Sequence, residues 1–227
     1  MSIASIICLI LGVLALAFYI PEKIRGYTVK AVFLKSAVSV LFIATAVTAG
    51  SAGIISPFIE MGLVFGLLGD IWLDLKYVFR EYDVHFTYAG FISFSIGHII
   101  YVTGLLIQFG PGLYLIPSFA LAALGAALAV ILEKPMKLSY GTMKPTVLIY
   151  VFLLLSTVFV SGGILVTAGG TMLAVFFAGS VLFAASDLVL SGTYFGAGKD
   201  RPVDLFLNYI FYYGGQFLIA FSLVFMK

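Results

Sequence analysis

Two aspartates lie within long apolar segments of this 227-residue chain. Asp70 follows Gly69, Asp187 follows Ser186, and each is followed by three large apolar residues. An aspartate at the centre of a membrane helix costs about 3 kcal/mol, so such residues usually face a wet cavity and serve a function. Burial and a neighbouring like charge both favour the protonated carboxyl, which is how carboxyl pairs perform acid–base catalysis. We interpret Asp70 and Asp187 as a catalytic pair, against the alternative that each carboxylate only bonds helices together or contacts water at a helix end.

Polar side chains recur at helical spacing in two other apolar segments. His98 has Tyr101 three residues later, and Asn208, Tyr212 and Gln216 follow one another at intervals of four, so each set lies on one helix face. Such a stripe either lines a cavity or supplies hydrogen bonds between helices. The candidate substrate-binding residues are Lys35, Asp74, His98, Tyr101, Asn208, Tyr212 and Gln216.

Two of these candidates are charged. Asp74 lies one turn after Asp70 and shares its helix face, where it could bind a ligand, orient Asp70 or contact solvent. Lys35 could extend to the membrane surface, bind a lipid phosphate, or pair with Asp70 or Asp187. One membrane histidine and two aspartates are weak evidence for a metal site, so we expect no metal and no cofactor. The motifs of serine lipases, zinc proteases and nucleotide triphosphatases do not occur.

The composition is that of a membrane protein. Hydrophobic residues make up 63% of the chain and charged residues 10%, whereas soluble domains average about 45–50% and about 25%. These values exclude a soluble globular protein and a disordered chain. The net charge of +2 provides no surface for a polyanion, so we expect no nucleic-acid partner. The single cysteine, Cys8, excludes a disulfide framework.

Eight segments are apolar and long enough to cross a bilayer, which takes about 20 residues in a helix. They are Ile3–Ile20, Ala31–Thr48, Pro57–Leu75, Phe86–Ile107, Leu113–Leu132, Pro145–Val166, Thr171–Ser191 and Leu205–Phe225. The first segment lacks the basic start and the cleavage motif of a signal peptide, so we interpret it as a retained helix. We therefore predict an all-α polytopic membrane protein with eight transmembrane helices, forming a single integral membrane domain over residues 1–227.

Basic residues occur in alternate connections between these segments. The connections that hold them contain Lys23, Arg25 and Lys30; Lys76 and Arg80; Lys134, Lys137 and Lys144; and Lys199 and Arg201. The connections from even to odd segments hold none. By the positive-inside rule, the basic connections face the cytoplasm and both termini face outside. For a bacterial source, the expected location is the plasma (inner) membrane.

The two halves of the chain share a short pattern. Asp70 and His98 are 28 residues apart, and Asp187 and Gln216 are 29 residues apart. The pattern suggests a four-helix unit used twice, and because four is even, the copies would be parallel, related by an axis along the membrane normal. Such a repeat would place both aspartates at the same depth, facing one cavity. The alternative is a coincidence of short motifs.

Four motifs in this order resemble the YhhN-like lysoplasmalogenase family of eight-helix membrane proteins. They are Gly69-Asp70, Gly97-His98-x-x-Tyr101, Ser186-Asp187 and Tyr212-Tyr213-Gly214-Gly215-Gln216, and the resemblance covers most of the chain. A Lys-Pro element associated with the family occurs at Lys144-Pro145, whereas Lys35 is followed by Ser36, and Asp74 has no counterpart in the pattern.

The resemblance implies hydrolysis of the vinyl-ether bond of lysoplasmalogens to a fatty aldehyde and glycerophospho-ethanolamine or -choline. It implies Asp70 and Asp187 as catalytic residues, with His98, Tyr101, Tyr212 and Gln216 lining the site, and a membrane lysophospholipid as the partner. Proton delivery to the outer alkene carbon creates an oxocarbenium ion, which water captures. One protonated carboxyl and one carboxylate suit this reaction, as in two-carboxylate glycosidases. Which aspartate plays which role stays open at this point.

Two other function classes fit the same residues. A small-molecule or ion transporter can also combine parallel repeats with intramembrane acids, and it predicts solute flux across a sealed vesicle. The glycines Gly62, Gly66 and Gly69 suit either a broken transporter helix or close helix packing. A non-catalytic membrane scaffold would tolerate neutralisation of both aspartates.

Overall fold

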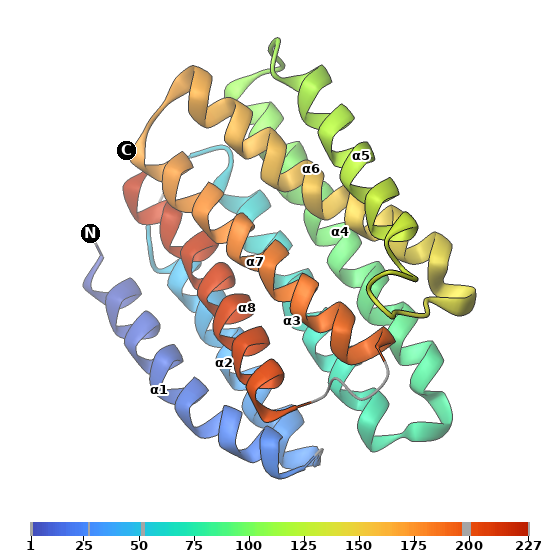
Figure 1. Ribbon diagram of the computed structural model, residues 1–227. Helices are drawn as coiled ribbons and strands as arrows, with labels where there is room; N and C mark the ends of the chain where they lie inside the picture. Colours follow the sequence, from blue (N-terminus) through green and yellow to red (C-terminus); the bar gives the residue numbers. More distant parts are fainter. Residues whose placement is uncertain (1, 27, 51–52, 197–200, 227) are drawn as a thin grey trace.

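Eight α-helices pack side by side in the computed structural model, which describes residues 2–26, 28–50, 53–196 and 201–226 (Figure 1). The helices are α1 (Ile3–Arg25), α2 (Val29–Val47), α3 (Ser56–Val78), α4 (Asp83–Phe109), α5 (Leu115–Ile131), α6 (Lys144–Ala168), α7 (Thr171–Phe195) and α8 (Pro202–Ser222). Short 3₁₀ turns occur at Arg80–Tyr82, Gly141–Met143 and Leu223–Phe225. Each predicted span coincides with one helix, so the all-α prediction is confirmed.

Six of the eight helices are long and apolar enough to cross a membrane. The two others are α5, which has 17 residues, and α3, which is 23 residues long but contains Glu60, Asp70, Asp74 and Lys76. Six spans define a polytopic membrane protein. The sequence predicted eight transmembrane helices. The described residues do form eight helices, but only six of them are long and apolar enough to cross a membrane by themselves.

Helices that follow one another in the chain pack in pairs, and two of these pairs cross at glycines. The pairs are α1 with α2, α3 with α4, α5 with α6 and α7 with α8. A Cβ atom on Gly215 of α8 would lie 2.8 Å from the Gly179 carbonyl oxygen of α7, and one on Gly97 of α4 would lie 3.1 Å from the Gly62 carbonyl oxygen of α3. Only glycine allows backbones to approach this closely, which is a common way to join membrane helices.

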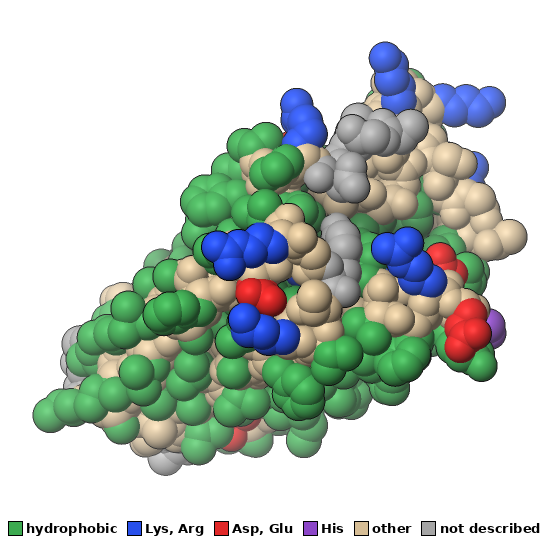
Figure 2. Space-filling model, turned by 90° about the horizontal axis from the view of Figure 1, so that it is seen from below, with side chains coloured by type: hydrophobic (Ala, Val, Ile, Leu, Met, Phe, Trp, Pro, Cys, Tyr) green, Lys and Arg blue, Asp and Glu red, His purple; other side chains and the backbone are tan. Residues whose placement is uncertain are grey.

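The two ends of the bundle differ in charge. Both chain termini lie at the same end, and the opposite end carries the connections that the sequence identified as basic (Figure 1). Figure 2 views that end and shows lysine and arginine side chains over it. Among the basic residues that the sequence assigned to these connections, five belong to helices rather than to loops, namely Lys23 and Arg25 in α1, Lys30 in α2, Lys76 in α3 and Lys144 in α6. Lys199 lies outside the described residues.

The connection between α5 and α6 at this end is held by specific polar contacts. Lys144 binds the Glu133 carboxylate at 2.5 Å, and the Tyr140 amide donates to the same carboxylate at 2.8 Å. These two partners hold the pKa of Glu133 below its ordinary value. The Ser139 amide donates to the Phe195 carbonyl oxygen at 2.8 Å, which fixes the connection against the end of α7. Tyr140 is thereby held over the interior of the bundle.

Candidate active site

A cavity of about 390 Å³ lies within the half of the bundle that carries the basic end. Helices α2 to α8 and the α5–α6 connection all contribute to its wall. Its polar lining includes Lys35, Asp70, Asp187, Asn208 and Tyr212, and most of the remaining lining is aliphatic or aromatic. The structure thus brings both candidate catalytic aspartates to one cavity, together with three of the seven candidate binding residues.

Asp70 is buried, and three donors surround its carboxyl group. Ser39 of α2 and Tyr212 of α8 donate their hydroxyls to Oδ2 of Asp70 at 2.6 and 2.8 Å, and the Lys35 ammonium lies 3.1 Å from Oδ1. Three donors, one of them charged, match the ionised form of a carboxyl group. Lys35 therefore forms an ion pair with Asp70, which is one of the alternatives that the sequence left open for this lysine.

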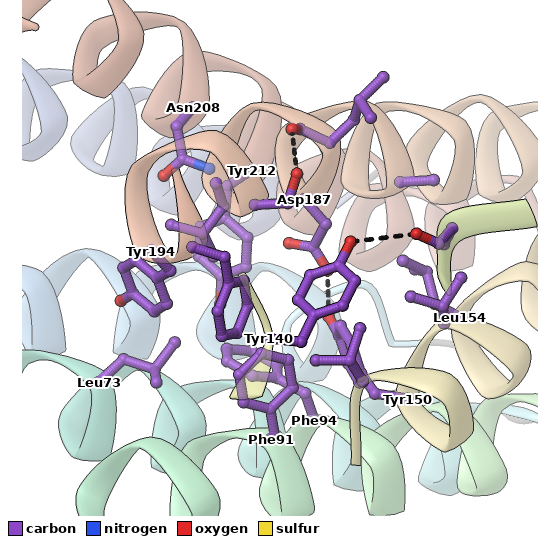
Figure 3. A pocket seen from close by; sticks show the side chains of 18 of the residues that line it. Leu73, Phe91, Phe94, Tyr140, Tyr150, Leu154, Asp187, Tyr194, Asn208 and Tyr212 are labelled. Atoms are coloured by element: carbon purple, nitrogen blue, oxygen red, sulfur yellow. Dashed lines mark hydrogen bonds between the residues drawn. The ribbon is translucent and has the colours of Figure 1, made fainter. Parts of the chain in front are cut away.

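Asp187 has a different environment. The Tyr150 hydroxyl of α6 donates to its Oδ2 atom, and Figure 3 shows this contact on the cavity wall. Ser186 makes a marginal contact of 3.5 Å with Oδ1. Within the described parts of the chain, no lysine or arginine forms an ion pair with Asp187. Asp187 is half-buried, whereas Asp70, on the wall of the same cavity, is buried.

Asp74 lies beside the cavity rather than on its wall. Its Oδ1 atom accepts from Lys23 of α1 at 2.7 Å and from Lys35 at 3.3 Å, and the Tyr19 hydroxyl lies 3.5 Å from Oδ2. Lys23, Lys35, Asp70 and Asp74 form a buried, charge-balanced cluster, which we call the ion quartet. Sequence reasoning missed the burial of Lys23, because Lys23 lies three residues beyond Ile20, where the first predicted span ends.

The remaining candidates lie deeper in the bundle. His98, Tyr101 and Gln216 line a second, much smaller space between α3, α4, α7 and α8, and they do not reach the cavity. His98 Nδ1 lies 3.1 Å from the Thr157 hydroxyl of α6. The Gln216 amide donates to the Tyr212 hydroxyl at 3.1 Å, so Gln216 touches the cavity only through Tyr212. The polar stripe of α4 faces this smaller space, where His98 Nε2, Tyr101 OH and Gln216 Oε1 are buried without a hydrogen-bond partner among the described residues.

Tyr150 is the functional candidate that sequence reasoning did not find. It is one of 13 tyrosines and belongs to no motif, so only the fold reveals that it faces Asp187. Tyr194 and Tyr209 also line the cavity and contact lysines, with Lys76 lying 3.3 Å from the Tyr194 ring centre and Lys35 lying 5.9 Å from that of Tyr209. A cation over an aromatic face is an attractive contact.

No group of three or more histidine, cysteine, aspartate or glutamate side chains suited to a metal ion occurs in the described residues. What the cavity contains is two carboxyl groups, hydroxyl donors and a long apolar wall. This arrangement can transfer a proton to a bound molecule and stabilise a positive charge beside it.

The fold and this cavity define a class: polytopic helical membrane proteins with two carboxyl groups on the wall of one internal cavity. A family model described as the YhhN family matches residues 30–223, so the chain belongs to the YhhN family, which includes lysoplasmalogenases. The family resemblance seen in the sequence is thereby confirmed. No curated protein and no solved structure matches the chain significantly.

Proposed function

We propose that this protein is a lysoplasmalogenase-like hydrolase, which cleaves the vinyl-ether bond of a lysoplasmalogen to a fatty aldehyde and glycerophospho-ethanolamine or -choline. The observation that carries the proposal is the pair of aspartates with opposite electrostatic surroundings on the wall of one largely apolar cavity. Membership of a family that includes lysoplasmalogenases supports it.

The surroundings of the two carboxyl groups suggest their roles. Lys35, Ser39 and Tyr212 stabilise the ionised form of Asp70, whose negative charge would then stabilise an oxocarbenium ion. Asp187 faces the apolar cavity with no cation bound to it among the described residues, which favours the protonated form. We therefore assign Asp187 as the general acid.

The reaction then balances with water as its co-reactant. Asp187 donates its proton to the outer alkene carbon, and the ether carbon becomes an oxocarbenium ion next to the Asp70 carboxylate. Asp187, now ionised, accepts a proton from the water that attacks this carbon, as the acid of a retaining glycosidase turns into a base. The resulting hemiacetal breaks its bond to the glycerol oxygen, which takes up the hemiacetal hydroxyl proton, and the aldehyde and alcohol are released.

The proposal includes a placement in the membrane. Equivalent glycine crossings support a parallel repeat of four helices, because Gly62 and Gly179 each precede their aspartate by eight residues. All eight helices would then cross the bilayer, with both termini outside and the basic end in the cytoplasm. The cavity would open in the cytoplasmic leaflet, and the expected location is a plasma (inner) membrane.

The test is aldehyde release by the purified protein. We expect release from a lysoplasmalogen and none from an ester lysophospholipid of the same chain length. Asp187→Asn should lower the rate by about 100-fold or more, which is a typical contribution of a general acid. Asp70→Asn should also lower it, whereas Asp204→Asn, which removes a surface carboxylate paired with Arg201, should not.

Two outcomes would contradict the proposal. One is full activity in either cavity variant, which would remove the aspartates from the mechanism. The other is no aldehyde from the folded wild-type protein with any vinyl ether. Solute flux in sealed vesicles, abolished by Asp187→Asn, would then identify a transporter instead.

A further inference from the structure

The cavity reaches the outer surface of the bundle on one flank. Three of its lining residues are substantially exposed: Leu128 of α5 at 43%, Leu132 directly after α5 at 41%, and Leu188 of α7 at 63%. The exposed large side chains of α5 and α7, such as Leu124, Ile131 and Val181, are apolar. The opening therefore leads sideways, toward the hydrocarbon of a bilayer, and we call these three leucines the lateral window.

The wall of the cavity changes in character from one side to the other. The lining residues from α5 and from the position directly after it are all apolar, namely Gly125, Leu128, Ala129 and Leu132. On the opposite side, α2 contributes Lys35, and α8 contributes three polar residues beside one leucine, namely Leu205, Asn208, Tyr209 and Tyr212. Asp187 lies on α7, the helix that also carries Leu188 of the window. A molecule that fits this gradient has a hydrocarbon end toward α5 and a polar end toward α8.

The corresponding place in the first half of the chain is closed. There α1, which pairs with α2 as α5 pairs with α6, brings Tyr19 and Lys23 against Asp74 of α3. In the second half α5 presents small and aliphatic residues instead, and Gly125 fits closely against Leu155 of α6, since a Cβ on Gly125 would lie 2.4 Å from its Cδ1 atom. The second half therefore opens to the membrane at a position that side chains of α1 fill in the first half.

We propose that the lateral window admits the hydrocarbon chain of a single-chain amphiphile directly from the bilayer, and that this chain lies along Gly125, Leu128 and Ala129 of α5 while the polar end reaches toward α8. The window is the access route and the chain-binding arm of the site. This proposal extends the proposed function, and the first experiment below rests on that function because it measures hydrolysis. Binding of the chain through the window requires no hydrolysis, so the second experiment measures binding alone.

The first experiment blocks the window. Leu128→Trp and Leu188→Trp enlarge the side chains that border it, and both should lower the ratio of activity on a long-chain lysoplasmalogen in vesicles to activity on butyl vinyl ether by about tenfold. Leu124→Trp is the matched control, because Leu124 lies one turn earlier on α5, is 56% exposed and does not line the cavity. Equal losses on both substrates, or an equal effect of Leu124→Trp, would overturn the proposal.

The second experiment measures binding without hydrolysis. The probe is an alkyl-ether lysophospholipid with a photoactivatable diazirine at the end of its chain, added to the wild-type protein and to Asp187→Asn in vesicles. We expect crosslinks within residues 125–132 and at Leu188, reduced by excess unlabelled lysophospholipid and by Leu128→Trp. Crosslinks there in a protein that releases no aldehyde would support the window while contradicting the proposed reaction. Crosslinks confined to other helices would overturn the window whether or not the protein hydrolyses vinyl ethers.

Discussion

Removal of the Lys35 ammonium tests whether the ion quartet stabilises the fold as one unit. The four charged side chains are at most 7% exposed, and their contacts range from 2.7 to 3.3 Å. Lys35→Met leaves Asp70 buried without its cation, and loss of one partner of a buried ion pair destabilises a protein by about 3–5 kcal/mol. In Asp70→Asn, Asp74 is the one carboxylate of the quartet that remains to bind both Lys23 and Lys35, so we expect a similar loss of stability.

The double variant distinguishes a charge pair from two independent contacts. Lys35→Met with Asp70→Asn removes a complete pair and keeps Lys23 bound to Asp74. It should therefore be more stable than the sum of the single losses predicts, by about 1–3 kcal/mol, the coupling expected of residues in contact. The measurement is denaturant unfolding of the four proteins of this cycle in one detergent.

Lys144→Met serves as the control for removing a lysine. The Lys144 side chain is 47% exposed, so Lys144→Met should lose less stability than Lys35→Met. Strict additivity in the double-mutant cycle would refute the reasoning, and so would a Lys35→Met variant that is no less stable than Lys144→Met. Either result would mean that Lys35 and Asp70 do not compensate each other's buried charge.

Three further predictions follow from local geometry. Tyr150→Phe removes the hydroxyl that donates to the proposed general acid, so kinetics of aldehyde release should show kcat lowered by about 10- to 100-fold, whereas loss of one hydrogen bond should cost only about 1 kcal/mol of stability. Gly215→Ala should destabilise the protein by about 1–3 kcal/mol because the new Cβ meets backbone atoms at 2.8 Å. Gly214→Ala, whose Cβ would meet only a leucine side chain at 3.5 Å, should unfold like the wild type. Since the pKa of Glu133 is lowered in the folded protein, its ionised form stabilises the α5–α6 connection at neutral pH, and this contribution is lost as the pH falls below about 4. Hydrogen-exchange protection of the Tyr140 amide should fall in acid accordingly, and Glu133→Gln should remove that dependence.

The helices and the central aspartates were predictable because they depend on patterns within single segments. Apolar runs of helical length mark each of the eight helices, and an aspartate inside such a run signals a special environment. The shared cavity of Asp70 and Asp187 followed from their equivalent positions in the two halves. These inferences needed no knowledge of how the helices pack.

The side chains that surround the aspartates were harder to predict, because they come from other helices. Lys23 ends up in the ion quartet since α1 continues to Arg25, beyond its apolar run. Tyr150 carries no sequence signal at all. His98 is the reverse case, since the sequence placed it at the cavity and the structure does not. Thr157 of α6 and Phe183 of α7 enclose it, and the ring centres of His98 and Phe183 are 5.0 Å apart.

The shortness of α5 has a consequence for the lipids around it. At 1.5 Å per residue, its 17 residues extend for about 26 Å, whereas the hydrocarbon core of a bilayer is about 30 Å thick. A crossing helix of this length creates hydrophobic mismatch, and the membrane relieves it by thinning locally. The thinned region would lie along α5, which carries Leu128 of the window and is directly followed by Leu132. Head groups would descend there toward the depth of Asp187, which shortens the path that a polar group must travel through hydrocarbon to reach the carboxyl pair. In bilayers of increasing thickness, the rate of aldehyde release would then fall because of the lipid environment, although the protein itself is unchanged.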